Sequence, residues 1–159
     1  MTQLITVKLG TGIKDRNGFY EAFISAGMKM GSWSSDIMLK PAFSISNSFL
    51  EATISIKTIF ELGLEEGARR DEIFQAVRRL GFLKCPPEVG PQLRLQYHDQ
   101  PEDEWLVICM DPIFDSNGDP RMFQVGRNNR GLWLVADLGD PFHIWKPHKK
   151  FVLLQPQVT

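Results

Sequence analysis

The residues best suited to chemistry in this 159-residue chain lie in one short stretch, residues 85–100, with the sequence CPPEVGPQLRLQYHDQ. Glu88 and His98 can titrate, and Arg94 between them carries a guanidinium that binds carboxylates and phosphates bidentately. Acid–base catalysis needs such groups within hydrogen-bond reach of a substrate. The stretch therefore allows an enzyme hypothesis, a hydrolase or transferase for an anionic small molecule. Glu88 or His98 would be its acid–base group and Arg94 its anion anchor.

The same stretch has a structural interpretation, which we favour: a proline-stiffened connection that leads into a strand. Six residues alternate with the period of a strand, Leu93, Leu95 and Tyr97 on an apolar face and Gln92, Arg94 and Gln96 on a polar face. The polar face is where we expect a ligand to bind. The predicted ligand-binding residues are Gln92, Arg94, Gln96, Tyr97 and the more distant Trp145.

Other chemical motifs are weak. Four possible metal ligands occur near the end of the chain, Asp137, Asp140, His143 and His148. Their spacing matches no familiar zinc site, and Asp140-Pro141 is typical of a turn. The chain has no Gly-x-Ser-x-Gly elbow, Walker loop or dinucleotide fingerprint. Cys85 would act as a nucleophile only with a histidine beside it, so we expect a buried structural thiol. We therefore predict no metal and no cofactor.

Aromatic and basic residues are concentrated in the last third of the chain: Trp105, Trp133, Phe142, Trp145 and Phe151, with Lys146, His148, Lys149 and Lys150. Aromatic rings beside cations can stack bases and hold phosphates. However, the tryptophans are expected largely in the core, and the motif of an RNA-recognition sheet is absent. We therefore expect a protein partner or a small ligand rather than nucleic acid. An exposed edge strand leaves a homodimer open.

Composition narrows the class of protein. The 18 basic and 19 acidic residues give a net charge of −1, which argues against a surface built to bind nucleic acid or an anionic membrane. The start, MTQLITVKLG, lacks the features of a signal peptide, and no apolar run approaches the roughly 20 residues of a membrane span. Cys85 and Cys109 form no CxxC motif, so we expect free thiols in a cytoplasmic protein, with a disulfide as the alternative.

Periodicity predicts several elements in the first half of the chain. Residues 4–9 alternate as a strand, and a helix follows that is capped by Asp15 or Asn17 and ended by Gly27. A short helical turn is expected before Pro41, with Ser34 or Ser35 as its cap. Strands at 42–46 and 52–60 are expected to pair as a hairpin. The clearest helix is RRDEIFQAVRRLG, whose apolar stripe is Ile73, Val77 and Leu80.

The last third contains four strand-like runs, EWLVICMDPI, PRMFQVGR, GLWLVADLG and KKFVLLQP, separated by turn sequences. This order predicts an antiparallel meander. Because no long linker or repeat interrupts the chain, we predict a single domain over residues 1–159. Its fold class is α+β, a mainly antiparallel sheet with two or three helices packed on one face.

The run CPPEVGPQLRLQYHDQPEDEWLVICMDPI, with GLWL and GDP further on, resembles a family of small uncharacterised bacterial proteins. Members share a Pro-Glu-Val-Gly-Pro-Gln-Leu-Arg-Leu-Gln-Tyr run that leads into a Trp-Leu strand, and the likeness covers most of the chain. The resemblance implies a shared fold and a bacterial source, and no activity.

Two functional hypotheses remain. The first is a binding or accessory protein that recognises a partner protein or a small ligand without catalysis. The second is the enzyme described above, which requires Glu88, Arg94 and His98 to face one cleft.

Overall fold

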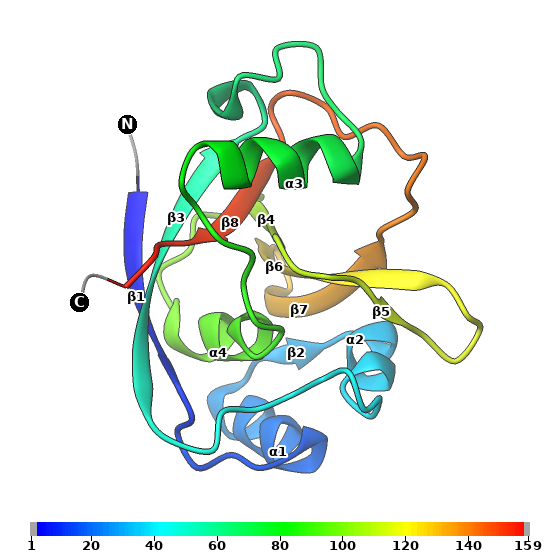
Figure 1. Cartoon of the computed structure of the whole chain (residues 1–159). Coiled ribbons are helices and arrows are strands. Elements are labelled where there is room, and N and C mark those ends of the chain that lie inside the picture. Colours follow the sequence, from blue (N-terminus) through cyan, green and yellow to red (C-terminus); the bar gives the residue numbers. More distant parts are fainter. Residues whose placement is uncertain (1–2, 158–159) are drawn as a thin grey trace.

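Residues 3–157, which the computed structural model describes, form an α+β fold with four α-helices, one 3₁₀ helix and an eight-stranded sheet (Figure 1). In chain order the elements are β1 (Gln3–Leu9), α1 (Arg16–Ala26), β2 (Lys29–Met30), α2 (Ser32–Ile37), β3 (Leu50–Thr58), η1 (Phe60–Leu62), α3 (Arg70–Arg79), α4 (Val89–Gln96), β4 (Trp105–Ile108), β5 (Ile113–Phe114), β6 (Pro120–Asn128), β7 (Gly131–Leu138) and β8 (Lys150–Leu154). The predicted α+β class is confirmed.

The sheet is mixed, with the strand order β1-β3-β8-β4-β6-β7-β2 and β5 paired to β6. The antiparallel β4–β6 and β6–β7 pairs confirm part of the predicted meander. The last predicted pair of the meander is wrong, because β8 does not pair with β7 in the sheet. The chain after β7 instead returns across the sheet, and β8 lies between β3 and β4, antiparallel to β3 and parallel to β4. A second parallel pair joins β2 to β7.

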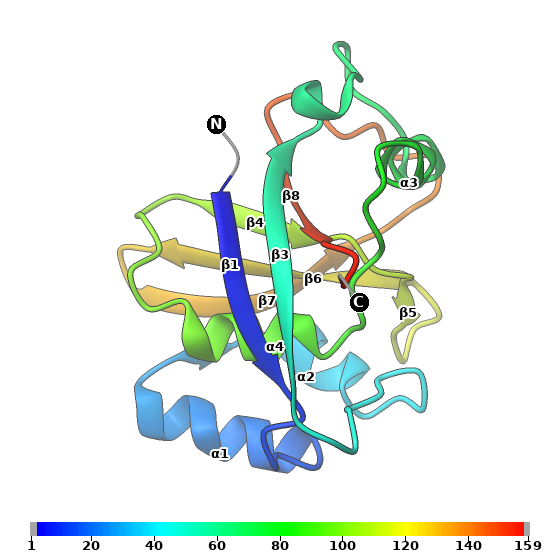
Figure 2. The ribbon, with the colours of Figure 1, turned by 60° about the vertical axis from the view of Figure 1, so that its left-hand side comes forward.

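The sheet curls, so that β1 and β3 pass in front of β6 and β7 in Figure 2. Helix α4 lies inside the curl, where it contacts β1 from one half and β6 and β7 from the other. Gly90 permits this close approach, because a Cβ there would lie 2.6 Å from the ring of Phe123. Helix α4 therefore joins the two halves of the sheet.

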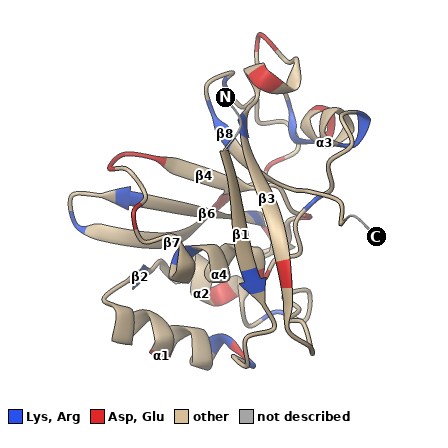
Figure 3. Cartoon of the chain, turned by 90° about the vertical axis from the view of Figure 1, so that its left-hand side faces the viewer, with Lys and Arg blue, Asp and Glu red and all other residues tan. Residues whose placement is uncertain are grey.

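The helices predicted after Asp15 and within RRDEIFQAVRRLG are confirmed as α1 and α3. The Asp15 carboxylate accepts a hydrogen bond from the Gly18 N–H at 2.9 Å, and Gly27 ends α1 in the left-handed region. In α3, Ile73 and Val77 are buried, as the apolar stripe predicts, while Leu80 is exposed. Helix α3 lies on the opposite side of β3 and β8 from α4 (Figures 2 and 3). The prediction that the helices pack on one face of the sheet is therefore wrong.

The predicted strand within QLRLQY is wrong, because residues 89–96 are helix α4. Its alternation covers only six residues, too few to separate a strand from a helix. The polar residues Glu88, Gln92 and Gln96 recur every fourth residue, a spacing that places them on one face of a helix. Pro91 falls in the first turn, where a proline removes no intrahelical hydrogen bond. These two signals favour a helix.

Two smaller predictions are also wrong. Residues 42–46 form no strand, so they make no hairpin with β3, which pairs instead with β1 and β8. Phe43 packs edge-on between the rings of Phe19 and Phe123, so its apolar character belongs to a loop that covers the core. The N-cap of α2 is Gly31, and the Ser34 hydroxyl donates to the carbonyl oxygen of Gly31 at 2.6 Å.

Charged residues of both signs are interspersed over the helices, strands and loops in Figure 3, in keeping with the balanced composition. Within residues 3–157, no helix combines the length and the apolar character that a membrane crossing requires.

Candidate functional site

The carboxylate of Glu88 is buried at the N-terminal end of α4, with 1% of the residue exposed. Its Oε1 accepts the N–H of Ser46 at 2.8 Å. Its Oε2 accepts the N–H of Gly10 at 2.8 Å and the Nε2–H of Gln92 at 3.0 Å. Glu88 therefore joins three segments that are far apart in the sequence: the end of β1, the loop before β3, and α4.

A cavity of about 460 Å³ lies beside this carboxylate. Most of its wall is apolar and comes from five segments: Leu9, Ile45, Leu50, Ala52, Leu83, Pro86 and Leu154. The polar wall residues are Ser44, Ser46, Gln155, Gln157 and Glu88. Glu88 is the only ionisable side chain among the residues that line the cavity. The site thus combines an apolar chamber with one buried anion.

No cation balances this anion in the part of the chain that the structure describes. The ion pairs there are Lys84–Asp111, Arg121–Asp115 and Lys150–Glu104, and none of them includes Glu88. A buried charge without a partner is costly unless hydrogen bonds replace the lost water. Three N–H donors and the N-terminal end of α4 supply that compensation for Glu88.

Arg94, at the other end of α4, has no exposed surface. One terminal nitrogen donates to Gln100 Oε1 at 2.6 Å and to the Gly126 carbonyl at 2.9 Å, and the other donates to the Tyr97 carbonyl at 2.5 Å. Burial lowers the pKa of Arg94 to about 10, so the guanidinium still carries its charge at neutral pH. The guanidinium is enclosed by neutral oxygens and holds the turn after α4 against β6.

The other polar residues predicted to bind a ligand attach α4 to β1. The Gln96 amide pairs with both the N–H and the carbonyl of Lys8, each at 2.8 Å. Tyr97 is buried, and its hydroxyl contacts Gln3 Nε2 at 3.3 Å and Glu104 Oε1 at 3.4 Å. Gln96 therefore satisfies the backbone N–H and carbonyl of Lys8 on the outer edge of β1.

Of the remaining predicted ligand residues, Gln92 is buried and its amide also donates to the Thr11 hydroxyl at 3.0 Å. Trp145 lies far from α4 in the sequence and is 4% exposed. Its ring packs edge-on against Phe151 with 5.4 Å between the ring centroids. Both side chains thus have packing or bonding roles within the fold.

The three groups of the enzyme hypothesis do not face one cleft. Glu88 points to Gly10 and Ser46, whereas Arg94 points to Gly126. His98 is exposed, and its ring Nε2 lies 2.5 Å from the Leu95 carbonyl oxygen in its own turn. The arrangement required for acid–base chemistry with an anion anchor is therefore missing from these residues.

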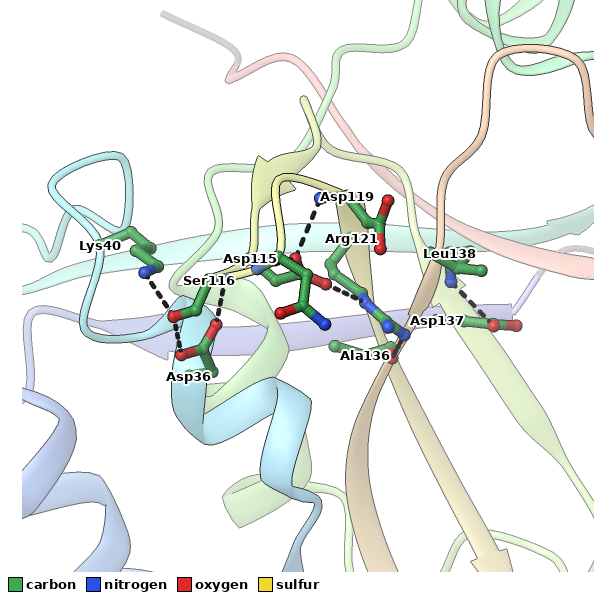
Figure 4. A network of polar contacts seen from close by, with 10 residues as sticks. Asp36, Lys40, Asp115, Ser116, Asp119, Arg121, Ala136, Asp137 and Leu138 are labelled. Atoms are coloured by element: carbon green, nitrogen blue, oxygen red, sulfur yellow. Dashed lines mark hydrogen bonds and ion pairs between the residues drawn. The ribbon is translucent and has the colours of Figure 1, made fainter.

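A second group of carboxylates lies around the β5–β6 turn (Figure 4). Asp115 accepts the N–H groups of Asn117 and Asp119 and pairs with Arg121 at 2.8 Å. Asp36 accepts two hydrogen bonds from Ser116. These contacts hold the turn and fasten it to α2. Across residues 3–157, no three His, Cys, Asp or Glu side chains are placed to bind one metal ion.

Both cysteines are free and buried, as the favoured interpretation predicts. The Cys85 N–H donates to the Cys109 carbonyl at 2.7 Å, and the Cys85 thiol lies 3.4 Å from the Val152 carbonyl oxygen. Burial, and then the neighbouring Cys109, raises the pKa of the Cys85 thiol, and burial raises the pKa of Cys109 to about 12. Such thiols are poor nucleophiles at neutral pH.

Sequence reasoning missed the cavity, although it singled out Glu88. The wall residues Leu9, Ala52 and Leu154 read only as ordinary strand residues, and nothing in their local sequence marks a ligand site. The partners of Arg94 were also missed, because Gly126 reaches it only through the curl of the sheet.

Comparisons with protein-family models, with curated proteins and with solved structures find no match to this chain. The resemblance to a bacterial family stays a prediction.

Proposed function

We propose that this chain is a binding protein without catalytic activity, which takes a small and mainly apolar molecule in the cavity beside Glu88. One observation carries this proposal: an apolar chamber whose only ionisable wall residue is a buried carboxylate. Its volume of about 460 Å³ falls within the range of about 300–1,000 Å³ that is usual for ligand pockets. Apolar walls with a few polar groups are also characteristic of such pockets.

The surroundings of Glu88 favour binding over catalysis. General acid–base chemistry on a bound molecule commonly needs a second titratable or anion-binding group near the first. The groups that contact the Glu88 carboxylate are two backbone N–H groups and the amide of Gln92. None of them can transfer a proton at neutral pH.

The proposal is tested with N-phenylnaphthylamine, an uncharged dye whose fluorescence rises in apolar sites. The full chain is titrated with the dye, and two loop variants are compared. Ser44→Trp places a large ring in the cavity wall, whereas Asn47→Trp places the same ring on an exposed position of the same loop, outside the wall. We expect the wild type and Asn47→Trp to bind the dye and Ser44→Trp to bind at least about tenfold more weakly.

No saturable binding by the wild type would refute the proposal. Equal binding by both variants would place the dye elsewhere on the molecule and would refute it as well.

A further inference from the structure

We infer that the molecule held in this cavity carries a positively charged nitrogen, which binds to Glu88. This inference rests on the proposed function and specifies the chemical class of its ligand. The ligand would be a small amine with an apolar body: the body fills the chamber and the ammonium group meets the carboxylate.

The hydrogen bonds of Glu88 leave one acceptor position open. A carboxylate has about four lone-pair sites for donors. Oε2 receives two donors, from Gly10 and Gln92, whereas Oε1 receives one, from Ser46. The oxygen with spare capacity is therefore the one bonded to Ser46, and Ser46 is itself a wall residue of the cavity.

Charge complementarity selects the ligand class. Glu88 is buried, and no ion pair of the described residues includes it. An ammonium group at Oε1 would complete its hydrogen bonds and supply the missing counter-charge, and charge-assisted hydrogen bonds are about twice as strong as neutral ones. An anionic ligand would instead be repelled, and a neutral one would leave Glu88 with its three hydrogen bonds and without an ionic partner.

The volume and the apolar wall of the cavity favour a small molecule over a single lysine side chain of a partner protein. A chamber of about 460 Å³ walled by Leu9, Leu50 and Leu154 exceeds what one lysine stem can fill. Apolar surface on the ligand is needed to cover these leucines.

The test uses three ligands with one apolar body and different head groups: octylamine, octanol and octanoate. Each displaces N-phenylnaphthylamine from the full wild-type chain at neutral pH. We expect octylamine to bind at least about tenfold more tightly than octanol, and octanoate to bind most weakly. The Ser44→Trp variant should weaken all three, which shows that they share the cavity.

Glu88→Gln sharpens the comparison, because it removes the charge and keeps the size of the side chain. The preference for octylamine over octanol should disappear in this variant, while octanol still binds. The wild-type series needs no variant, so a Glu88→Gln protein that fails to fold leaves the test intact.

The outcomes separate this inference from the proposed function. Equal affinity for octylamine and octanol, or tightest binding of octanoate, would overturn the inference and leave a neutral apolar site standing. If none of the three ligands binds and the dye does not bind either, the proposed function itself is overturned.

Discussion

The two ends of helix α4 place opposite charges in the interior in different ways. Glu88 and Arg94 are both buried, and neither forms an ion pair among the described residues. Each charge lies at the end of α4 that the helix dipole favours, the carboxylate at the N-terminal end and the guanidinium in the last turn. Up to this point the two sites are equivalent.

They differ in what surrounds the charge. Arg94 donates three hydrogen bonds to oxygens fixed by the fold, its Nε has no partner among the described residues, and it has no exposed surface. Glu88 accepts three hydrogen bonds and also keeps one position open, but it lies in the wall of a cavity. A buried charge by itself thus does not indicate a ligand site. A buried charge beside free volume does, because only there can another molecule reach it.

The largest expected effect tests the structural role of Arg94. In Arg94→Met, the carbonyl oxygens of Tyr97 and Gly126 and the side-chain oxygen of Gln100 lose their donors. We expect a loss of about 3 kcal/mol in the free energy of unfolding, measured in urea. The matched control is Arg79→Met, at an exposed position of α3, which should change stability by less than about 0.5 kcal/mol.

A loss similar to that of the control would show that Arg94 is not a structural anchor. The folded fraction of Arg94→Met should still bind N-phenylnaphthylamine with the affinity of the wild type, because Arg94 does not line the cavity beside Glu88.

The next largest effect is the loss of stability when the Glu88 carboxylate is removed. Glu88→Ala leaves the N–H groups of Gly10 and Ser46 and the amide of Gln92 without their acceptor. Water can enter from the cavity and replace part of the loss, so we expect about 2 kcal/mol of destabilisation, less than at Arg94. Chemical denaturation measures the difference, with Glu66→Ala on an exposed loop as control. A loss larger than that of Arg94→Met would reverse the comparison between the two ends.

A smaller effect is expected for Gln96, which ties α4 to β1. Gln96→Ala removes two hydrogen bonds to the backbone of Lys8 at a partly exposed place, where water can substitute. We expect a loss of about 1 kcal/mol in urea unfolding. Hydrogen exchange at the Lys8 amide should accelerate in the same variant, and unchanged exchange would show that Gln96 does not protect the edge of β1.

The smallest effect is expected at His98. Its side chain is exposed, and its ring nitrogen lies beside the carbonyl oxygen of Leu95, one turn earlier. His98→Ala should change the free energy of unfolding by less than about 0.5 kcal/mol and should leave dye binding unchanged. A loss of ligand affinity in this variant would instead support a ligand site that includes both Glu88 and His98.

Some of the fold follows from local sequence signals. Helices α1 and α3 and the β6–β7 hairpin carry caps, dipole-matched charges or turn residues within a few positions, and each was predicted. The pattern of residues 92–97 predicts a strand where the structure has helix α4, because a six-residue alternation is compatible with both periods. The position of β8 was also missed, since nothing local indicates which distant strand a segment will join.

For the site, sequence reasoning selected Glu88 and Arg94 as chemically capable groups, and that selection depended only on residue type and proximity along the chain. Their environments could not be predicted. The oxygens around Arg94 include one on β6, and the walls of the cavity come from β1, β3, β8 and two connecting segments.

The sequence by itself determined the α+β class, two of the helices and the presence of paired opposite charges on one short segment. The tertiary structure alone decided that one of these charges is enclosed by carbonyl oxygens and that the other faces a cavity. The physical reason is the distance along the chain over which each interaction acts. Helix caps and hydrophobic periods act over a few residues, whereas the curl of the sheet brings to the two ends of α4 residues that are 32 and 78 positions away, in the contacts Arg94–Gly126 and Glu88–Gly10.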